Sequence, residues 1–116
     1  MSRRASAPAA SVPLPNAAAI FSALGDATRL RLITVLCVEG AMSIVQLTSG
    51  TDITRQAVTK HLQVLAAAGL VRDVKVGRER LWEFERARLE EARHSLDLIA
   101  QEWDRALLRL KLAVEG

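Results

Sequence analysis

The stretch SIVQLTSG (residues 43–50) is followed by TRQAVTKHLQVLAAAG (54–69) and LVRDVKVGRERLWEF (70–84). The first two segments each end in a glycine, so they predict a short helix that stops at Gly50 and a longer helix that stops at Gly69. The third segment predicts strands over 70–76 and 81–84, joined by the charged tip 77–80. Helix, turn, helix and charged hairpin in this order are typical of a winged helix-turn-helix, which indicates a DNA partner.

The residues before this stretch predict a tail and two more helices. Residues 1–15 are mostly alanine, serine and proline and predict a disordered tail. We expect Asn16 to cap a helix that ends at Gly25, and Asp26 to cap a second helix that ends at Gly40. Ser43 and Thr54 are expected to cap the third and fourth helices. Apolar residues recur at helical spacing in the second helix and include the only cysteine, which we interpret as an inert buried thiol: Leu30, Ile33, Leu36 and Cys37.

From about residue 86 to residue 114 the chain contains no glycine or proline and predicts one long helix. Its apolar residues fall at steps of three, four or seven and form a narrow seam of Leu89, Leu96, Ile99, Trp103, Leu107, Leu110 and Val114. Such a helix is about 43 Å long, more than a domain of this size can cover, so we expect an identical subunit to cover the seam. The alternative is that the seam packs only on the first helix of the same chain. The predicted dimer interface is Ile20, Phe21, Leu24, Leu96, Ile99, Trp103, Leu107 and Leu110.

Length and charge agree with a small DNA-binding protein. A chain of 116 residues corresponds to one domain, here 16–116, and its net charge is +3. Residues 54–80 hold six basic and two acidic side chains (+4), whereas residues 81–116 hold six basic and eight acidic ones (−2). Positive charge is therefore concentrated on the second half of the predicted helix-turn-helix and on the hairpin, where phosphates would lie. A single cysteine, no signal peptide and no long apolar run predict a protein of the reducing cytoplasm without a membrane partner.

The predicted second helix of the helix-turn-helix has an inner and an outer face. Val58, Leu62, Leu65 and Gly69 share the inner face, and the outer face carries polar side chains near the start of the helix. Arginine reads guanine and glutamine reads adenine in the major groove, while lysine supplies a point charge for phosphate or guanine. The role of His61 stays open between a phosphate donor and a half-buried histidine bonded to the backbone. The predicted DNA contacts are Arg55, Gln56, Thr59, Lys60, His61, Arg78 and Arg80.

The run FSALGDATRLRL (residues 21–32) resembles the opening motif of the ArsR/SmtB family of bacterial repressors, with Ala27 where that family usually has proline. The resemblance continues through QAVTKHL (56–62), AGLV (68–71) and Gly77-Arg78, and it covers roughly residues 17–116. It implies a homodimeric winged-helix repressor on an imperfect palindrome, with DNA contacts at Arg55, Gln56, Thr59 and Lys60.

The sensor residues of that family are not recognisable in this chain. The arsenic-sensing members carry two cysteines at positions that correspond here to Ser43 and Val45. The last helix offers His94 and Asp97 without a second histidine downstream, which falls short of a tetrahedral zinc site. We therefore expect no metal, no cofactor and an unknown effector.

Three function classes remain to be compared. We expect a sequence-specific DNA-binding transcriptional regulator, and specifically a repressor that binds a palindromic operator as a homodimer. The alternative is a winged helix that makes only protein–protein contacts, but such surfaces favour aromatic and aliphatic anchors over a polar face. An enzyme is not expected, because the chain has no phosphate-binding glycine loop, no zinc-protease motif and no nucleophile elbow.

Overall fold

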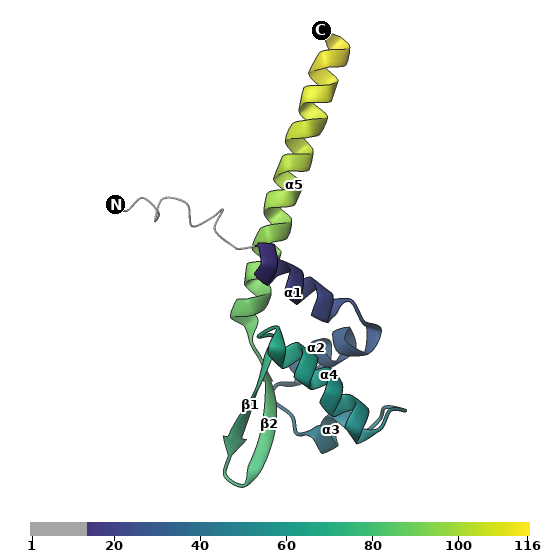
Figure 1. The fold of residues 1–116 in the computed structure, drawn as a ribbon, viewed down its shortest axis with the longest axis vertical. Helices are drawn as coiled ribbons and strands as arrows, with labels where there is room; N and C mark the ends of the chain where they lie inside the picture. Colours follow the sequence, from purple (N-terminus) through teal and green to yellow (C-terminus); the bar gives the residue numbers. More distant parts are fainter. Residues whose placement is uncertain (1–13) are drawn as a thin grey trace, which may run out of the picture.

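The computed structural model describes residues 14–116, with side chains from residue 17 onward. Its elements are α1 (Leu14–Leu24), α2 (Ala27–Glu39), α3 (Ile44–Thr48), α4 (Arg55–Ala67), β1 (Val71–Val76), β2 (Glu79–Phe84) and α5 (Arg86–Glu115). Helices α1 to α4 pack together, the hairpin extends from one side of them, and α5 projects away from the body (Figure 1). The predicted order of four helices, a hairpin and a long last helix is confirmed.

Three of the helix starts are set by the side chains that the sequence predicted. The Asp26 carboxylate accepts a hydrogen bond from the Arg29 backbone N–H at 3.0 Å. Thr54 accepts one from the Ala57 N–H at 3.0 Å. Ser43 and Gln46 form a reciprocal capping box, with distances of 3.2 and 2.9 Å. Each cap satisfies a backbone donor that the helix leaves open and contributes about 1 kcal/mol.

Two predicted boundaries are wrong, one by three residues and the other by two. Helix α1 begins at Leu14, so Asn16 lies inside the first turn and does not cap it. Proline is tolerated there because the first backbone N–H groups of a helix have no intrahelical partner, and Pro15 therefore does not delay the start. Residues 1–13 of the predicted tail lie outside the described residues. The return strand begins at Glu79 and not at Leu81, because a two-residue turn with Gly77 at φ +64° closes the hairpin.

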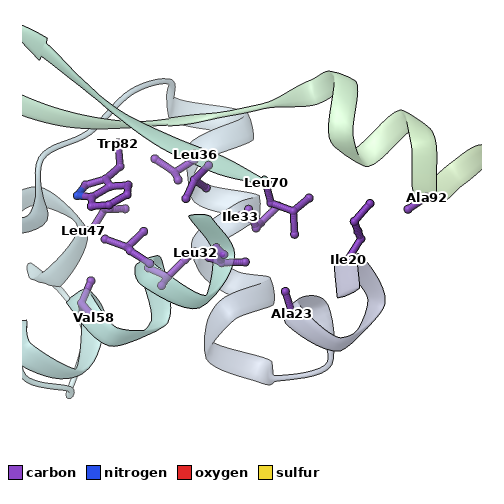
Figure 2. Packing of buried hydrophobic residues seen from close by; sticks show 13 residues of the cluster. Ile20, Ala23, Leu32, Ile33, Leu36, Leu47, Val58, Leu70, Trp82 and Ala92 are labelled. Atoms are coloured by element: carbon purple, nitrogen blue, oxygen red, sulfur yellow. The ribbon is translucent and has the colours of Figure 1, made fainter. Parts of the chain in front are cut away.

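The core is formed by one face of each helix and by the base of the hairpin (Figure 2). The predicted inner face of α4 is confirmed, since Val58, Leu62 and Leu65 are fully buried. The rest of the core cluster is Ile20, Ala23, Leu32, Ile33, Leu36, Leu47, Leu70, Val71, Trp82 and Ala92.

The predicted buried face of α2 is only half right. Ile33 and Leu36 are buried, but the third core residue is Leu32, while Leu30 is 51% exposed and Cys37 is exposed. A helix turns about 100° per residue, which places Leu30 and Cys37 roughly a quarter turn or more from the buried face. The interpretation of Cys37 as a buried thiol is therefore wrong for the single chain.

Helix α5 is covered by the rest of the chain only near its start. Ala92 and Ser95 are its buried residues, and α1 is the helix that packs on it. Beyond them most of the apolar seam is open to solvent: Leu96, Ile99, Trp103, Leu107, Leu110 and Val114. Ile20 of α1 is fully buried within one chain, beside the same cluster as Ala92, so its predicted place in the dimer interface is wrong.

Candidate nucleic-acid interface

The outer face of α4 presents a compact group of polar side chains. Gln56, Lys60 and Gln63 are exposed and Thr59 is half-buried, and the four line a shallow hollow of about 430 Å³. They share this face because Val58, Leu62 and Leu65 turn the opposite face into the core. The surface therefore offers amide, hydroxyl and ammonium groups on a rigid helix, which is the chemistry that reads base edges.

Thr59 is held in a defined orientation. Its hydroxyl donates a hydrogen bond to the Arg55 backbone carbonyl at 2.9 Å. The donor of the hydroxyl is thereby used within the helix, and its oxygen remains an acceptor while its methyl group stays available for apolar contact.

Arg55 connects α4 with the hairpin. A second hollow of about 250 Å³ lies between the start of α3, the start of α4 and β2, and Arg55 and Arg80 both line it. Arg80 pairs with Lys75 across the strands, on the same face as Trp82. The start of α4 and the hairpin thus meet at this hollow, through Arg55 and Arg80.

The cations of this surface differ in how far they are neutralised. Arg72 lies 3.0 Å from Glu83 and 2.5 Å from Glu85, and Arg80 lies 3.3 Å from Asp73 (all from Nε to a carboxylate oxygen). Within residues 14–116, four cations of the 54–80 segment form no ion pair with another side chain: Arg55, Lys60, Lys75 and Arg78. Their charge is not offset by a neighbouring carboxylate and is available to phosphate.

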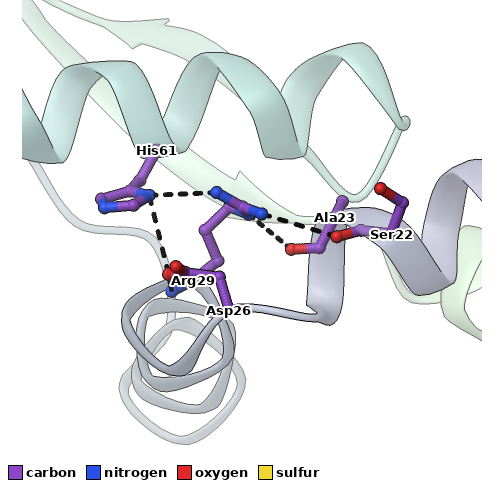
Figure 3. A network of polar contacts seen from close by, with 5 residues as sticks. All are labelled: Ser22, Ala23, Asp26, Arg29 and His61. Atoms are coloured by element: carbon purple, nitrogen blue, oxygen red, sulfur yellow. Dashed lines mark hydrogen bonds and ion pairs between the residues drawn. The ribbon is translucent and has the colours of Figure 1, made fainter.

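His61 lies apart from the other predicted contacts. Its Nδ1 is 3.3 Å from Nη1 of Arg29 and 3.8 Å from Oδ2 of Asp26, on the side of α4 that meets the α1–α2 turn (Figure 3). The ring is half-buried, which agrees with the second of the two roles considered for it from the sequence. Its partners, however, are side chains and not the backbone. Sequence reasoning missed Asp26 and Arg29 as its partners, because 32 residues separate Arg29 from His61 and no local pattern joins them.

The described residues show no group of side chains arranged for a metal ion. Between residues 14 and 116, no three His, Cys, Asp or Glu side chains come close enough to hold one. Although Cys37 is exposed, the neighbouring atoms remove part of the water around its thiol and raise its pKa, which disfavours the thiolate that binds soft metals. Among the helices of the same range, none has both the length and the apolar character that crossing a membrane requires.

Comparison with known proteins agrees with this geometry. A family profile described as a helix-turn-helix domain matches residues 24–74. The HTH-type transcriptional regulator YuzN of Bacillus subtilis is 40% identical over 75 residues, which span 60% of this chain and 82% of that protein. The regulator Rv2034 of Mycobacterium tuberculosis is 34% identical over 75% of this chain and 78% of its own length.

Solved structures give the same result. An ArsR-like transcriptional regulator from Rhodococcus sp. RHA1 superposes with a TM-score of 0.78 at 38% identity, covering 85% of this chain and 92% of that one. The chain therefore belongs to the ArsR family of winged helix-turn-helix proteins. It is a DNA-binding transcriptional regulator, and its fold and family are those of regulators and not of enzymes.

Proposed function

We propose that this regulator is a repressor that binds a two-fold symmetric operator as a homodimer, with α4 of each subunit in a major groove. The observation that carries the proposal is the group of polar and cationic side chains on the outer face of α4, next to the hollow where Arg55 of α4 and Arg80 of the hairpin meet. A dimer seated across a promoter blocks access to the DNA without any further contact surface.

Four side chains of α4 are assigned to the major groove. Arg55 lies at the start of the helix, where recognition helices approach the bases, and it forms no ion pair within residues 14–116. We assign it to guanine and Gln56 to adenine, because their bidentate geometry suits these bases. Thr59 presents an acceptor and a methyl group, and Lys60 a point charge for phosphate or guanine.

The hairpin is assigned to the DNA backbone or the adjacent minor groove. Arg78 is exposed at the turn, and Arg80 shares the hollow with Arg55. Because Asp73 partly neutralises Arg80, Arg78 is expected to be the stronger phosphate contact. His61 is not assigned to DNA, since its ring faces Arg29 and Asp26.

The homodimer is assigned to the seam of α5 together with the exposed part of α1. Trp103 is 63% exposed and Leu107 45% exposed in the single chain. Monomeric proteins rarely leave a continuous apolar stripe of this length open to water, so a second α5 is the simplest cover. Phe21 and Leu24 are half-buried and complete the proposed interface with Leu96, Ile99, Trp103, Leu107 and Leu110.

No metal effector is proposed. Ser43 and Val45 cannot supply a thiolate pair, and His94 with Asp97 gives too few ligands for a closed tetrahedral site. Operator affinity should therefore be the same with a chelator or with stoichiometric Zn(II), Cd(II) or As(III). A tenfold metal-dependent release that disappears in His94→Ala would contradict this. The reducing cytoplasm remains the expected compartment, in agreement with a single cysteine and a DNA partner.

The test is a binding experiment with DNA from immediately upstream of the chain's own gene. Fluorescence anisotropy should show binding that weakens steeply with salt, and footprinting should show two protected half-sites about 34 Å apart. Random DNA of equal length is the control. Equal affinity for both DNAs would contradict sequence-specific repression, and absence of any binding would contradict the proposed interface.

A further inference from the structure

Three polar side chains join the recognition helix to the turn between α1 and α2 (Figure 3). The Arg29 guanidinium donates from Nε to the Ala23 carbonyl at 2.6 Å and from Nη2 to the Ser22 carbonyl at 3.5 Å. Its third nitrogen, Nη1, lies 3.3 Å from Nδ1 of His61 in α4. One guanidinium therefore contacts the last turn of α1 and the middle of α4, and we call Asp26, Arg29 and His61 the latch.

The chemistry of arginine fixes the protonation state that closes the latch. A guanidinium has five N–H donors and no acceptor, so its hydrogen bond to the ring requires a lone pair on Nδ1 of His61. The ring must then be neutral with its proton on Nε2. A second proton would occupy Nδ1, remove the acceptor and place two cations beside each other.

The nearby carboxylate compensates this repulsion only in part. Within residues 14–116 the charged groups at the His61 ring are Arg29 and Asp26, and α1 contributes only backbone carbonyls to the same cluster. Asp26 Oδ2 is 3.8 Å from Nδ1, farther than the 3.3 Å to the Arg29 nitrogen. That carboxylate already accepts the Arg29 backbone N–H as the cap of α2, which restrains it from moving toward the ring. Protonation of His61 should therefore open the latch.

The latch lies between the two working parts of the protein. On one side, His61 follows Lys60 directly on α4, the helix proposed to read DNA. On the other, Arg29 holds the end of α1, and α1 packs on α5, which carries the seam proposed for the dimer. A hydrogen bond between these two sides fixes the angle at which each recognition helix is presented by the dimer.

We propose that Arg29 and His61 are positioning residues for operator recognition, which hold α4 against the α1–α2 turn and make sequence preference depend on the protonation of His61. The inference rests on the proposed function, since it assumes that α4 reads the bases. Sequence preference depends on helix placement, whereas contacts with phosphate tolerate a change of angle. Acid should therefore lower the affinity for operator more than the affinity for random DNA. The ratio of operator affinity to random-DNA affinity cancels the general effect of added positive charge.

The experiment measures that ratio by anisotropy at constant ionic strength, from about pH 8 down to about pH 5.5, the range in which histidine changes charge. For the wild-type chain we expect the ratio to fall by about fivefold per half-site, the factor that corresponds to one hydrogen bond. His61→Gln keeps an acceptor for Arg29 but does not titrate, so its ratio should not change with pH. Arg29→Lys keeps the charge but cannot hydrogen-bond the α1 carbonyls and the His61 ring at the same time. Its affinity ratio should therefore be low at every pH.

The chain contains a matched control, because His94 is its only other histidine. His94→Gln should keep the pH dependence of the wild type. An equal pH dependence in the wild type and in His61→Gln would overturn the latch while leaving the proposed function intact.

A second measurement does not need DNA and covers the case in which a variant fails to fold. Nitrogen-15 NMR of the wild-type imidazoles should show His61 at neutral pH with its proton on Nε2 and a lone pair on Nδ1. A proton on Nδ1 would overturn the latch. If the wild type showed no operator preference at any pH, the proposed function would fail, and the NMR result would still decide the latch.

Discussion

Removal of one hairpin arginine should change the salt dependence of DNA binding, and removal of another should not. Arg78 is exposed at the turn and forms no ion pair within residues 14–116, whereas Arg72 is held by Glu83 and Glu85. Both changes to alanine remove one formal charge per subunit, so the comparison isolates the position of the charge. A cation that meets phosphate releases a condensed counterion, and a cation already neutralised by carboxylates does not.

The magnitude follows from the number of unpaired cations. If all four unpaired cations, Arg55, Lys60, Lys75 and Arg78, met phosphates, the eight in a dimer would give a slope of log affinity against log salt of about −7, which is the upper limit. Arg78→Ala should make this slope shallower by about 2. The ratio of wild-type to Arg78→Ala affinity should therefore fall by about tenfold between 50 and 200 mM salt. Arg72→Ala should leave the slope nearly unchanged.

The assay is a salt titration of anisotropy on operator and on random DNA. Arg78→Ala should weaken both DNAs to a similar extent, since a phosphate contact carries no base information. Equal slopes for Arg78→Ala and wild type would show that the hairpin points away from the duplex. Equal reductions for Arg78→Ala and Arg72→Ala would show that total charge matters and that the ion pairs seen in the structure do not.

Three further changes test the rest of the structure. Arg55→Ala should cost about 1–3 kcal/mol of operator binding and relax specificity at one base per half-site. If binding to random DNA weakened equally, Arg55 would contact only phosphate. The double variant Trp103→Ala, Leu107→Ala should sediment as a folded monomer. It should bind a palindrome no better than a half-site, and a persistent dimer would contradict the assigned seam. Gly69→Ala should cost about 1–2 kcal/mol in urea unfolding because Gly69 has φ +79°. Gly50→Ala is its control, since its φ is +84° and nothing lies within 4 Å of the added carbon. A carbon added at Gly69 would also lie 2.5 Å from Nε of Arg88, so Gly69→Ala should cost more than Gly50→Ala, and a smaller cost would contradict this contact.

The parts of the fold that could be predicted from sequence are those governed by local chemistry. The caps at Asp26, Ser43 and Thr54 bond backbone groups only three residues away, so their signal lies within one turn. The inner face of α4 was equally clear, because a helix with one polar and one apolar face can be packed in only one way.

The features that could not be predicted depend on contacts between distant segments. Leu30 and Ile33 are both apolar and three residues apart, and only the neighbouring helices decide that Ile33 is buried and Leu30 exposed. Ile20 looked like Phe21 and Leu24 in sequence, yet it is fully buried within the chain, in the same core cluster as Ala92 of α5. The partner of His61 is likewise set by the packing of α1 and α2 against α4.

The exposed seam of α5 explains why this small domain should act as a dimer and not as a monomer. A single α4 offers four assigned contacts, and its hairpin offers two more, which is little for selecting one site in a genome. Joining two such surfaces rigidly makes the second binding event intramolecular and multiplies the affinity. The multiplication requires that both recognition helices match the spacing of the grooves, about 34 Å. The contacts that fix α4 relative to α1 and α5 are therefore as important for operator choice as the side chains that touch the bases.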